Sequence, residues 1–153
     1  MPMIARKQNG FSLIEVLIAL LILAIGLFGM ASLMMTSMKS NQSASMRSQA
    51  SWLAYDIFER MRLNSDVATS SSSYVIATNA AAPTDPNCKT SGCSETNVAV
   101  QDLFEWKTQL VQSGLTGSVT RTGNAYTVSI FWQEDSSTAC PANQCSFVLR
   151  ADL

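Results

Sequence analysis

The sequence predicts an α+β fold in which one long N-terminal helix packs on a small antiparallel sheet. Residues 16–31 carry no polar side chain, residues 46–61 repeat apolar residues at helical spacing, and residues 117–151 contain stretches in which apolar and polar residues alternate. The first two patterns are typical of a helix, and alternation is typical of antiparallel strands that bury one face. We therefore expect the apolar stripe of the helix to cover one face of the sheet.

The first element is an apolar segment over residues 11–35, interrupted only by two serines and by Glu15. About 20 apolar residues in a helix are enough to cross a bilayer. Hydropathy alone leaves two interpretations open, a single-pass anchor or a secretory signal peptide with Arg6 and Lys7 as its basic region and cleavage after Ala31. Glu15 favours a functional role for the segment, because an ionisable group inside a membrane helix is costly.

The residues around Glu15 form a recognisable motif. Residues 6–20 read Arg-Lys-Gln-Asn-Gly-Phe-Ser-Leu-Ile-Glu-Val-Leu-Ile-Ala-Leu. This segment resembles the class III signal of type IV pilins and of type II secretion pseudopilins, in which a short basic leader ends in glycine directly before an apolar helix. The resemblance implies that prepilin peptidase cleaves between Gly10 and Phe11 and methylates the new N-terminus at Phe11. It also implies that Glu15 is the carboxylate used in filament assembly.

The continuation of the motif is rich in methionine and is followed by serine and glutamine, and it is similar to minor pilins of the PilV type. The resemblance divides the chain into three parts. Residues 1–10 are a leader peptide, residues 11–35 are the transmembrane and assembly half of the helix, and residues 36–153 are a periplasmic pilin-like domain. A protein of this kind is stored in the inner membrane as a single-pass protein with its C-terminal domain in the periplasm, and then enters a pilus at the cell surface.

Residues 36–63 contain no proline or glycine, so we expect one helix over residues 11–63. Two alternatives remain open. The serine-rich residues 39–45 include poor helix formers and favour a break, and Gly26 or Gly29 favours a kink. The expected apolar stripe comprises Met46, Ala50, Leu53, Ala54, Ile57 and Met61, widened by Trp52, Tyr55 and Phe58.

Residues 64–97 are rich in Ser, Asn, Asp and Pro and are expected to form a long surface loop, with a short strand possible at residues 74–76. A second helix of about four turns should follow, with Thr96 or Asn97 as its N-cap and Gly114 after its end. Its apolar residues at helical spacing are Ala99, Leu103, Trp106 and Leu110.

Three strands are predicted in the last part of the chain. Residues 117–122 precede Gly123-Asn124, a pair that is typical of a two-residue hairpin turn. Residues 126–133 and residues 146–151 alternate between apolar and polar side chains. A long helix on such a sheet also resembles the pilin fold, so the pattern and the resemblance predict the same architecture.

The four cysteines form two pairs with equal spacing, Cys88 with Cys93 and Cys140 with Cys145. Structural zinc sites and redox motifs favour the shorter spacing Cys-x-x-Cys. An even number of cysteines in a small exported domain favours two disulfides and an oxidising compartment. Three connectivities are possible, and the short equal spacings favour the pairing within each motif.

Composition excludes several classes of function. The chain has no histidine, which removes a Ser-His-Asp triad, a Cys-His dyad and any zinc site that contains histidine. Its 10 basic and 11 acidic residues offer no surplus of positive charge for nucleic acid. Asp102 and Glu105 are interpreted as solvated charges, and Trp106 and Trp132 as core residues. We expect no enzyme activity, no cofactor and no metal.

The expected function is that of a minor pilin that helps to initiate or prime assembly of a type IV pilus. Its implied partners are other minor and major pilins, prepilin peptidase and the inner-membrane assembly platform. The first alternative is a minor pseudopilin of type II secretion or a subunit of a DNA-uptake pilus. A membrane-tethered periplasmic adaptor that does not polymerise is the second alternative, and a secreted enzyme released by cleavage near Ala31 is the last.

Overall fold

The structure is a computed structural model of the chain, and it describes residues 10–134, 140 and 143–153. The chain divides into two compact units, with the boundary between Gln42 and Ser43. Of the expected leader peptide, only Gly10 is among the described residues.

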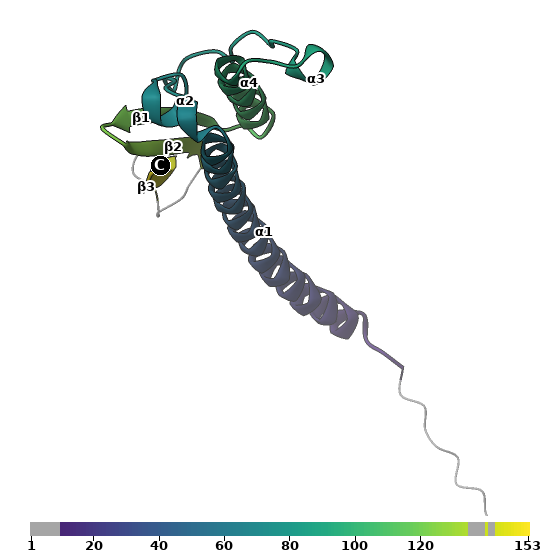
Figure 1. Ribbon diagram of the computed structural model, residues 1–153. Helices are drawn as coiled ribbons and strands as arrows, with labels where there is room; N and C mark the ends of the chain where they lie inside the picture. The colour runs from purple at the N-terminus through teal and green to yellow at the C-terminus, as the bar shows by residue number, and fades with distance from the viewer. Residues whose placement is uncertain (1–9, 135–139, 141–142) are drawn as a thin grey trace, which may run out of the picture. The chain divides into compact units, whose positions relative to one another are not determined.

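Helix α1 (Leu13–Leu63) contains the apolar segment from Leu13 onward and the amphipathic stripe (Figure 1). It is helical through residues 39–45. The expected long helix is therefore confirmed, and the alternative of two helices with a break in this stretch is wrong. The carbonyl of Ser12 begins the helix by accepting hydrogen bonds from the backbone N–H groups of Glu15 and Val16. The absence of proline and glycine after Gly29 leaves no residue that would interrupt the helix there.

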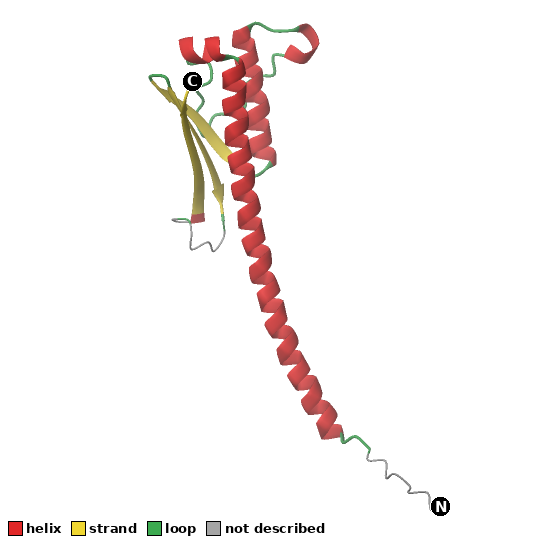
Figure 2. Cartoon of the chain, turned by 60° about the horizontal axis from the view of Figure 1, so that its bottom comes forward, coloured by secondary structure: helices red, strands yellow, loops and turns green. Residues whose placement is uncertain are grey.

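The second unit places the end of α1 and the helix α4 (Glu95–Gln112) beside a three-stranded sheet (Figure 2). The strands are β1 (Thr116–Thr122), β2 (Ala125–Gln133) and β3 (Gln144–Asp152), in the order β1-β2-β3. Both pairings are antiparallel, with Val119 opposite Val128 and Val128 opposite Leu149. The α+β fold class is therefore confirmed.

The core lies between α1, α4 and the inner face of the sheet. Trp106 and Trp132 are buried as expected, and the indole N–H of Trp106 donates to the carbonyl of Leu53 at 2.9 Å. Trp52 and Tyr55 do not widen the buried stripe, because 61% and 54% of their surfaces are exposed. Both lie on the side of α1 opposite the buried residue Ile57, whereas the other residues of the stripe are buried or, for Met46, partly buried.

The segment between α1 and α4 is more ordered than the expected loop. It contains α2 (Ser65–Ser70) and α3 (Cys88–Ser91). In place of a strand at residues 74–76, Ile76 forms an isolated antiparallel bridge with Val119. Serine and asparagine favour turns, but here the buried residues Val67, Ala68 and Tyr74 anchor the segment to the core.

Helix α4 begins earlier than predicted. Its N-cap is Ser94, whose hydroxyl accepts a hydrogen bond from the backbone N–H of Asn97 at 3.4 Å, so the expected caps Thr96 and Asn97 are wrong. The expected end is confirmed: Gly114 follows the helix with φ of +70°, a conformation that glycine adopts without strain. Gly123 has φ of +63° in the hairpin turn for the same reason.

Candidate functional site

The first candidate site is the start of the described chain. Gly10 and Phe11 precede the helix, both are exposed, and 85% of the Phe11 surface is accessible. A peptide bond outside regular structure is open to a protease, because its backbone groups are not held in a helix or sheet. The Gly10–Phe11 bond therefore has the accessibility that the expected cleavage requires. The basic residues Arg6 and Lys7 lie outside the described residues.

The apolar half of α1 has no cover within its own unit. Its large side chains are exposed all round the helix, and the most apolar 18-residue window has a mean hydropathy of 2.7 with none of its residues buried. Among the described residues this is one helix that is long and apolar enough to cross a membrane. An apolar helix surface of this size needs lipid or other apolar helices around it.

Glu15 is the single ionisable residue between Phe11 and Met38. It lies in the first turn of α1 and is exposed. No cation among the described residues forms an ion pair with it. Surrounded by apolar side chains on one helix, this carboxylate can act as an electrostatic contact for a positive group supplied by the chain's own N-terminus or by another protein.

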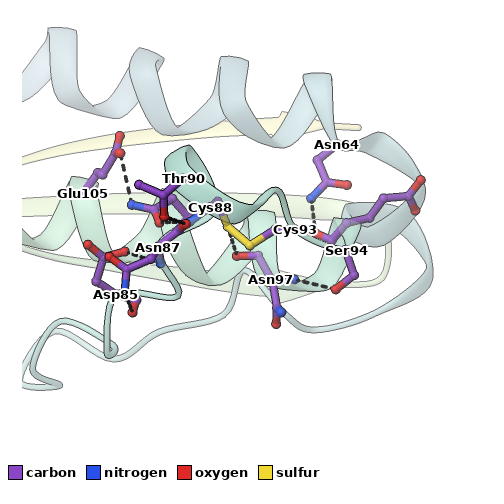
Figure 3. The surroundings of a disulfide bond; sticks show 11 residues. Asn64, Asp85, Asn87, Cys88, Thr90, Cys93, Ser94, Asn97 and Glu105 are labelled. Carbon is purple, nitrogen blue, oxygen red and sulfur yellow. Dashed lines mark hydrogen bonds between the residues drawn. A yellow bond between two sulfur atoms is a disulfide. The ribbon is translucent and has the colours of Figure 1, made fainter.

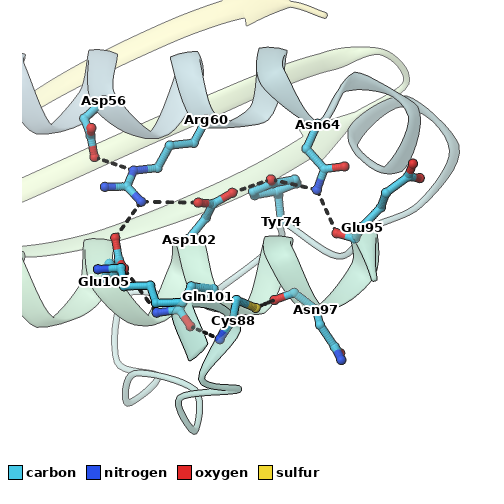
Figure 4. A network of polar contacts seen from close by, with 11 residues as sticks. Asp56, Arg60, Asn64, Tyr74, Cys88, Glu95, Asn97, Gln101, Asp102 and Glu105 are labelled. Carbon is cyan, nitrogen blue, oxygen red and sulfur yellow. Dashed lines mark hydrogen bonds and ion pairs between the residues drawn. The ribbon is translucent and has the colours of Figure 1, made fainter. Parts of the chain in front are cut away.

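A second cluster of charged side chains joins α1 to α4 (Figure 4). The Arg60 guanidinium donates to Asp56 on its own helix at 2.9 Å. It also donates to Asp102 at 3.2 Å and to Glu105 at 2.8 Å, both on α4. Asp102 accepts a further hydrogen bond of 2.7 Å from the hydroxyl of Tyr74. The expectation that Asp102 and Glu105 are solvated charges is therefore wrong, since both are paired and Asp102 is buried.

These contacts shift several pKa values. Burial disfavours the charged form of Arg60, but ion pairs led by Glu105 outweigh it and raise the pKa of Arg60. The hydrogen bond from Lys89, together with Arg60, lowers the pKa of Glu105 against a smaller opposing effect of burial. Burial and the hydrogen bond to Asp102 raise the pKa of Tyr74. All these groups are held in their ordinary charge state at neutral pH, so the cluster links two helices and is not arranged for proton transfer.

Disulfides join Cys88 to Cys93 and Cys140 to Cys145. Figure 3 shows the first, which ties α3 to the residues just before α4. The backbone N–H of Cys88 donates to the side chain of Gln101 at 3.3 Å, so this disulfide also positions α3 against α4. The second disulfide connects the residues before β3 with Cys145 on that strand, which is buried against the core.

Removal of the first disulfide by the double substitution Cys88→Ser and Cys93→Ser should lower the free energy of unfolding by about 2 kcal/mol, which is the entropic contribution expected for so short a loop.

Peptide mapping without reductant should recover Cys88 linked to Cys93 and Cys140 linked to Cys145. Free thiols in protein taken from the cell envelope, or a stoichiometric bound metal, would contradict this pairing.

Two protein-family models together match residues 5–104 of the chain. Residues 5–31 match the model of the prokaryotic N-terminal methylation motif, and residues 32–104 match the Tt1218-like model, described as type IV pilin Tt1218. No curated protein and no solved structure matches the chain. The first match contains Gly10, Phe11 and Glu15. The second contains the first disulfide and the residues of the Arg60 cluster other than Glu105.

Proposed function

Because the chain belongs to the type IV pilin family, a family of structural subunits, we propose that it is a minor pilin of the PilV type that helps to initiate assembly of a type IV pilus. The observation that carries the proposal is Glu15, one exposed carboxylate in an exposed apolar helix directly after the Gly10–Phe11 bond. A helix used only as an anchor has no need of a carboxylate at this position, because its presence in lipid is costly.

In this proposal prepilin peptidase cleaves between Gly10 and Phe11 and methylates the new amino group of Phe11. Residues 11–35 then hold the protein in the inner membrane, and residues 36–153 lie in the periplasm. The two disulfides suit this topology, because the periplasm is oxidising. Before assembly, lipid covers the apolar side chains of α1, and in the filament the helices of other minor and major pilins replace it.

The cleavage step can be tested by mass spectrometry of the protein extracted from membranes. We expect a mature N-terminus at Phe11 that carries one additional methyl group. In a strain without prepilin peptidase the chain should keep residues 1–10. A mature chain that begins at Ser32 would instead identify a secretory signal peptide, and the proposal would be wrong.

Assignment to a pilus is tested separately by deletion of the gene. We expect fewer surface pili and unchanged secretion of proteins through the outer membrane, with piliation restored to the wild-type level by the intact gene. Normal piliation with defective secretion would assign the chain to a pseudopilus. Normal levels of both would favour the membrane-tethered adaptor.

A further inference from the structure

The outer edge of β3 is open. The strand lies at the end of the sheet order β1-β2-β3, and no segment among the described residues pairs with its outer side. The opposite edge of the sheet is different, because Ile76 covers β1 with two backbone hydrogen bonds to Val119 of 3.0 and 2.9 Å. The fold therefore protects one edge and leaves the other available.

The backbone groups that β3 directs outward can be identified. The N–H of Leu153 donates to Asn124 and the carbonyl of Asn143 accepts from Glu134, so residues 143 and 153 face β2. Hydrogen-bonding direction alternates along an antiparallel strand. The odd-numbered residues of β3 therefore pair with β2, and the even-numbered ones direct their N–H and C=O groups outward. These are Gln144, Ser146, Val148, Arg150 and Asp152.

The core is also incomplete beside β3. Val128 and Ile130 on β2 are completely buried, whereas their partners Leu149 and Phe147 on β3 are only partly buried. These side chains point to the same face as the core residues, because each lies directly opposite a buried residue of β2. A further strand would cover them.

The edge has neither a proline nor a bulge, two of the features that prevent pairing, although it carries the charged residues Arg150 and Asp152. Its nine residues are continuous and contain no proline, and no bulge interrupts the register with β2. Val148 is exposed on the outer face between the polar residues Ser146 and Arg150. An open strand edge of this length is a template on which a strand of another chain can pair.

We propose that the outer edge of β3 binds an extended segment of a partner protein, which adds an antiparallel fourth strand to the sheet. The segment would carry apolar residues at alternate positions, opposite Phe147 and Leu149. It would carry an acidic residue opposite Arg150 and a basic one opposite Asp152, because opposite charges on facing strands stabilise a pair.

The occupant is another protein and not a second copy of this strand. β3 ends near the same end of the unit as α1 (Figure 2), so antiparallel pairing of two β3 strands would direct the two copies of residues 43–63 oppositely. Chains anchored in one membrane by the same N-terminal helix share a direction. The exclusion of a second copy rests on the proposed membrane anchoring, whereas binding of a peptide to the edge is independent of it.

The probe is the labelled peptide Lys-Val-Glu-Val-Thr-Val-Thr-Ile-Lys, written in the direction that runs antiparallel to β3. Its binding to the full mature chain in detergent micelles is measured by fluorescence anisotropy. A peptide of the same composition with its apolar residues contiguous is the control. We expect saturable binding of the alternating peptide and binding weaker by roughly tenfold for the control.

The decisive variant is Val148→Pro. It removes an N–H that points outward and no hydrogen bond to β2, so proline is compatible with this position of an edge strand. Binding should fall by roughly tenfold, while Val148→Ala, which keeps the N–H, should bind within about threefold of the wild type. Circular dichroism of both variants monitors folding.

A charge exchange tests the register without proline. Arg150→Glu should weaken binding of the peptide about threefold, and replacing the glutamate of the peptide with lysine should restore it. Equal binding of the alternating and control peptides, or binding unaffected by Val148→Pro and Arg150→Glu, would overturn the proposal. A concentration-dependent dimer of the full chain that Val148→Pro abolishes would assign the edge to a second copy, and would also overturn it.

Discussion

Replacing Arg60 with methionine should lower the free energy of unfolding by about 2–3 kcal/mol. Methionine keeps the apolar stem but leaves Asp102 and Glu105 without the cation that they share in a largely enclosed site. Removing one partner of a fully buried pair costs about 3–5 kcal/mol, and the 23% exposure of the Arg60 side chain reduces that value. Urea unfolding of the full chain in micelles, followed by near-ultraviolet circular dichroism, measures the loss.

Arg62→Met is the matched control for this substitution. Arg62 lies two residues further along α1 and pairs with Glu59, but the two side chains are 55% and 60% exposed. An exposed pair of this kind contributes less than about 0.5 kcal/mol. Equal losses in the two variants would mean that the link between α1 and α4 does not stabilise the fold.

The effect of Arg60→Met should also depend on pH. Lys89 and Arg60 lower the pKa of Glu105 in the folded chain. A carboxyl group with a lowered folded pKa stabilises the fold above its unfolded pKa, and this contribution is lost as pH falls through the folded value. The variant has less of this contribution to lose. The difference in stability between the two proteins should therefore narrow as the pH falls from neutral to below about 4.

Helices α1 and α4 and the three strands were predictable because each has a pattern that acts within a few residues, whereas α2 and α3 lie in a segment that was expected to be a loop. The apolar run and the stripe of α1 set its length, and the glycine at position 123 marks the turn between β1 and β2. The exposure of Trp52 and Tyr55 was not predictable from hydrophobicity, because their helical phase places them opposite the buried residue Ile57. Phase decided burial here, and residue type did not.

Contacts between distant segments could not be read from the sequence. Asp102 resembles a surface charge on a polar helix until α1 is placed beside α4 and Arg60 comes within 3.2 Å. Lys107 is similar: it is buried, and its ammonium donates to the carbonyls of Ala77, Thr78 and Gly117 at 3.0–3.1 Å. The partner of Asp102 is 42 positions away in the sequence, and Lys107 has one partner 29 positions away and another on β1. Such contacts leave no pattern in the residues around Asp102 or Lys107.

The candidate assembly site was predictable for the opposite reason. Gly10, Phe11 and Glu15 lie within six consecutive residues, so their spacing is a local property. Phe11, Glu15 and the apolar residues around them are all exposed in the structure. Residues 10–15 have no cationic side chain, so they do not identify the positive group that pairs with the Glu15 carboxylate.

Glu15→Val should leave the chain processed and membrane-bound but reduce its content in sheared filaments by roughly tenfold or more. In lipid a carboxylate near the centre of a span costs about 2.5–3.5 kcal/mol, and less toward the surface. The N-terminal end of α1 offsets this by about 0.3–1 kcal/mol. Glu15 therefore needs a cation. Valine removes the cost of a carboxylate in lipid, and it also removes the charge that would favour transfer of the subunit from lipid to the filament.

The proposed cation is the amino group of Phe11 on a neighbouring subunit, which cleavage creates. Pairing across subunits would neutralise one charge on each chain when a subunit leaves lipid for the filament, so it would favour assembly without strengthening insertion. Glu59→Val, which removes a carboxylate from the exposed part of the same helix, should enter filaments at the wild-type level. Quantitative immunoblots of membranes and of sheared filaments compare the three proteins. If Glu15→Val assembled as well as the wild type, the carboxylate would be merely tolerated in the membrane, and an apolar helix alone would have to account for assembly.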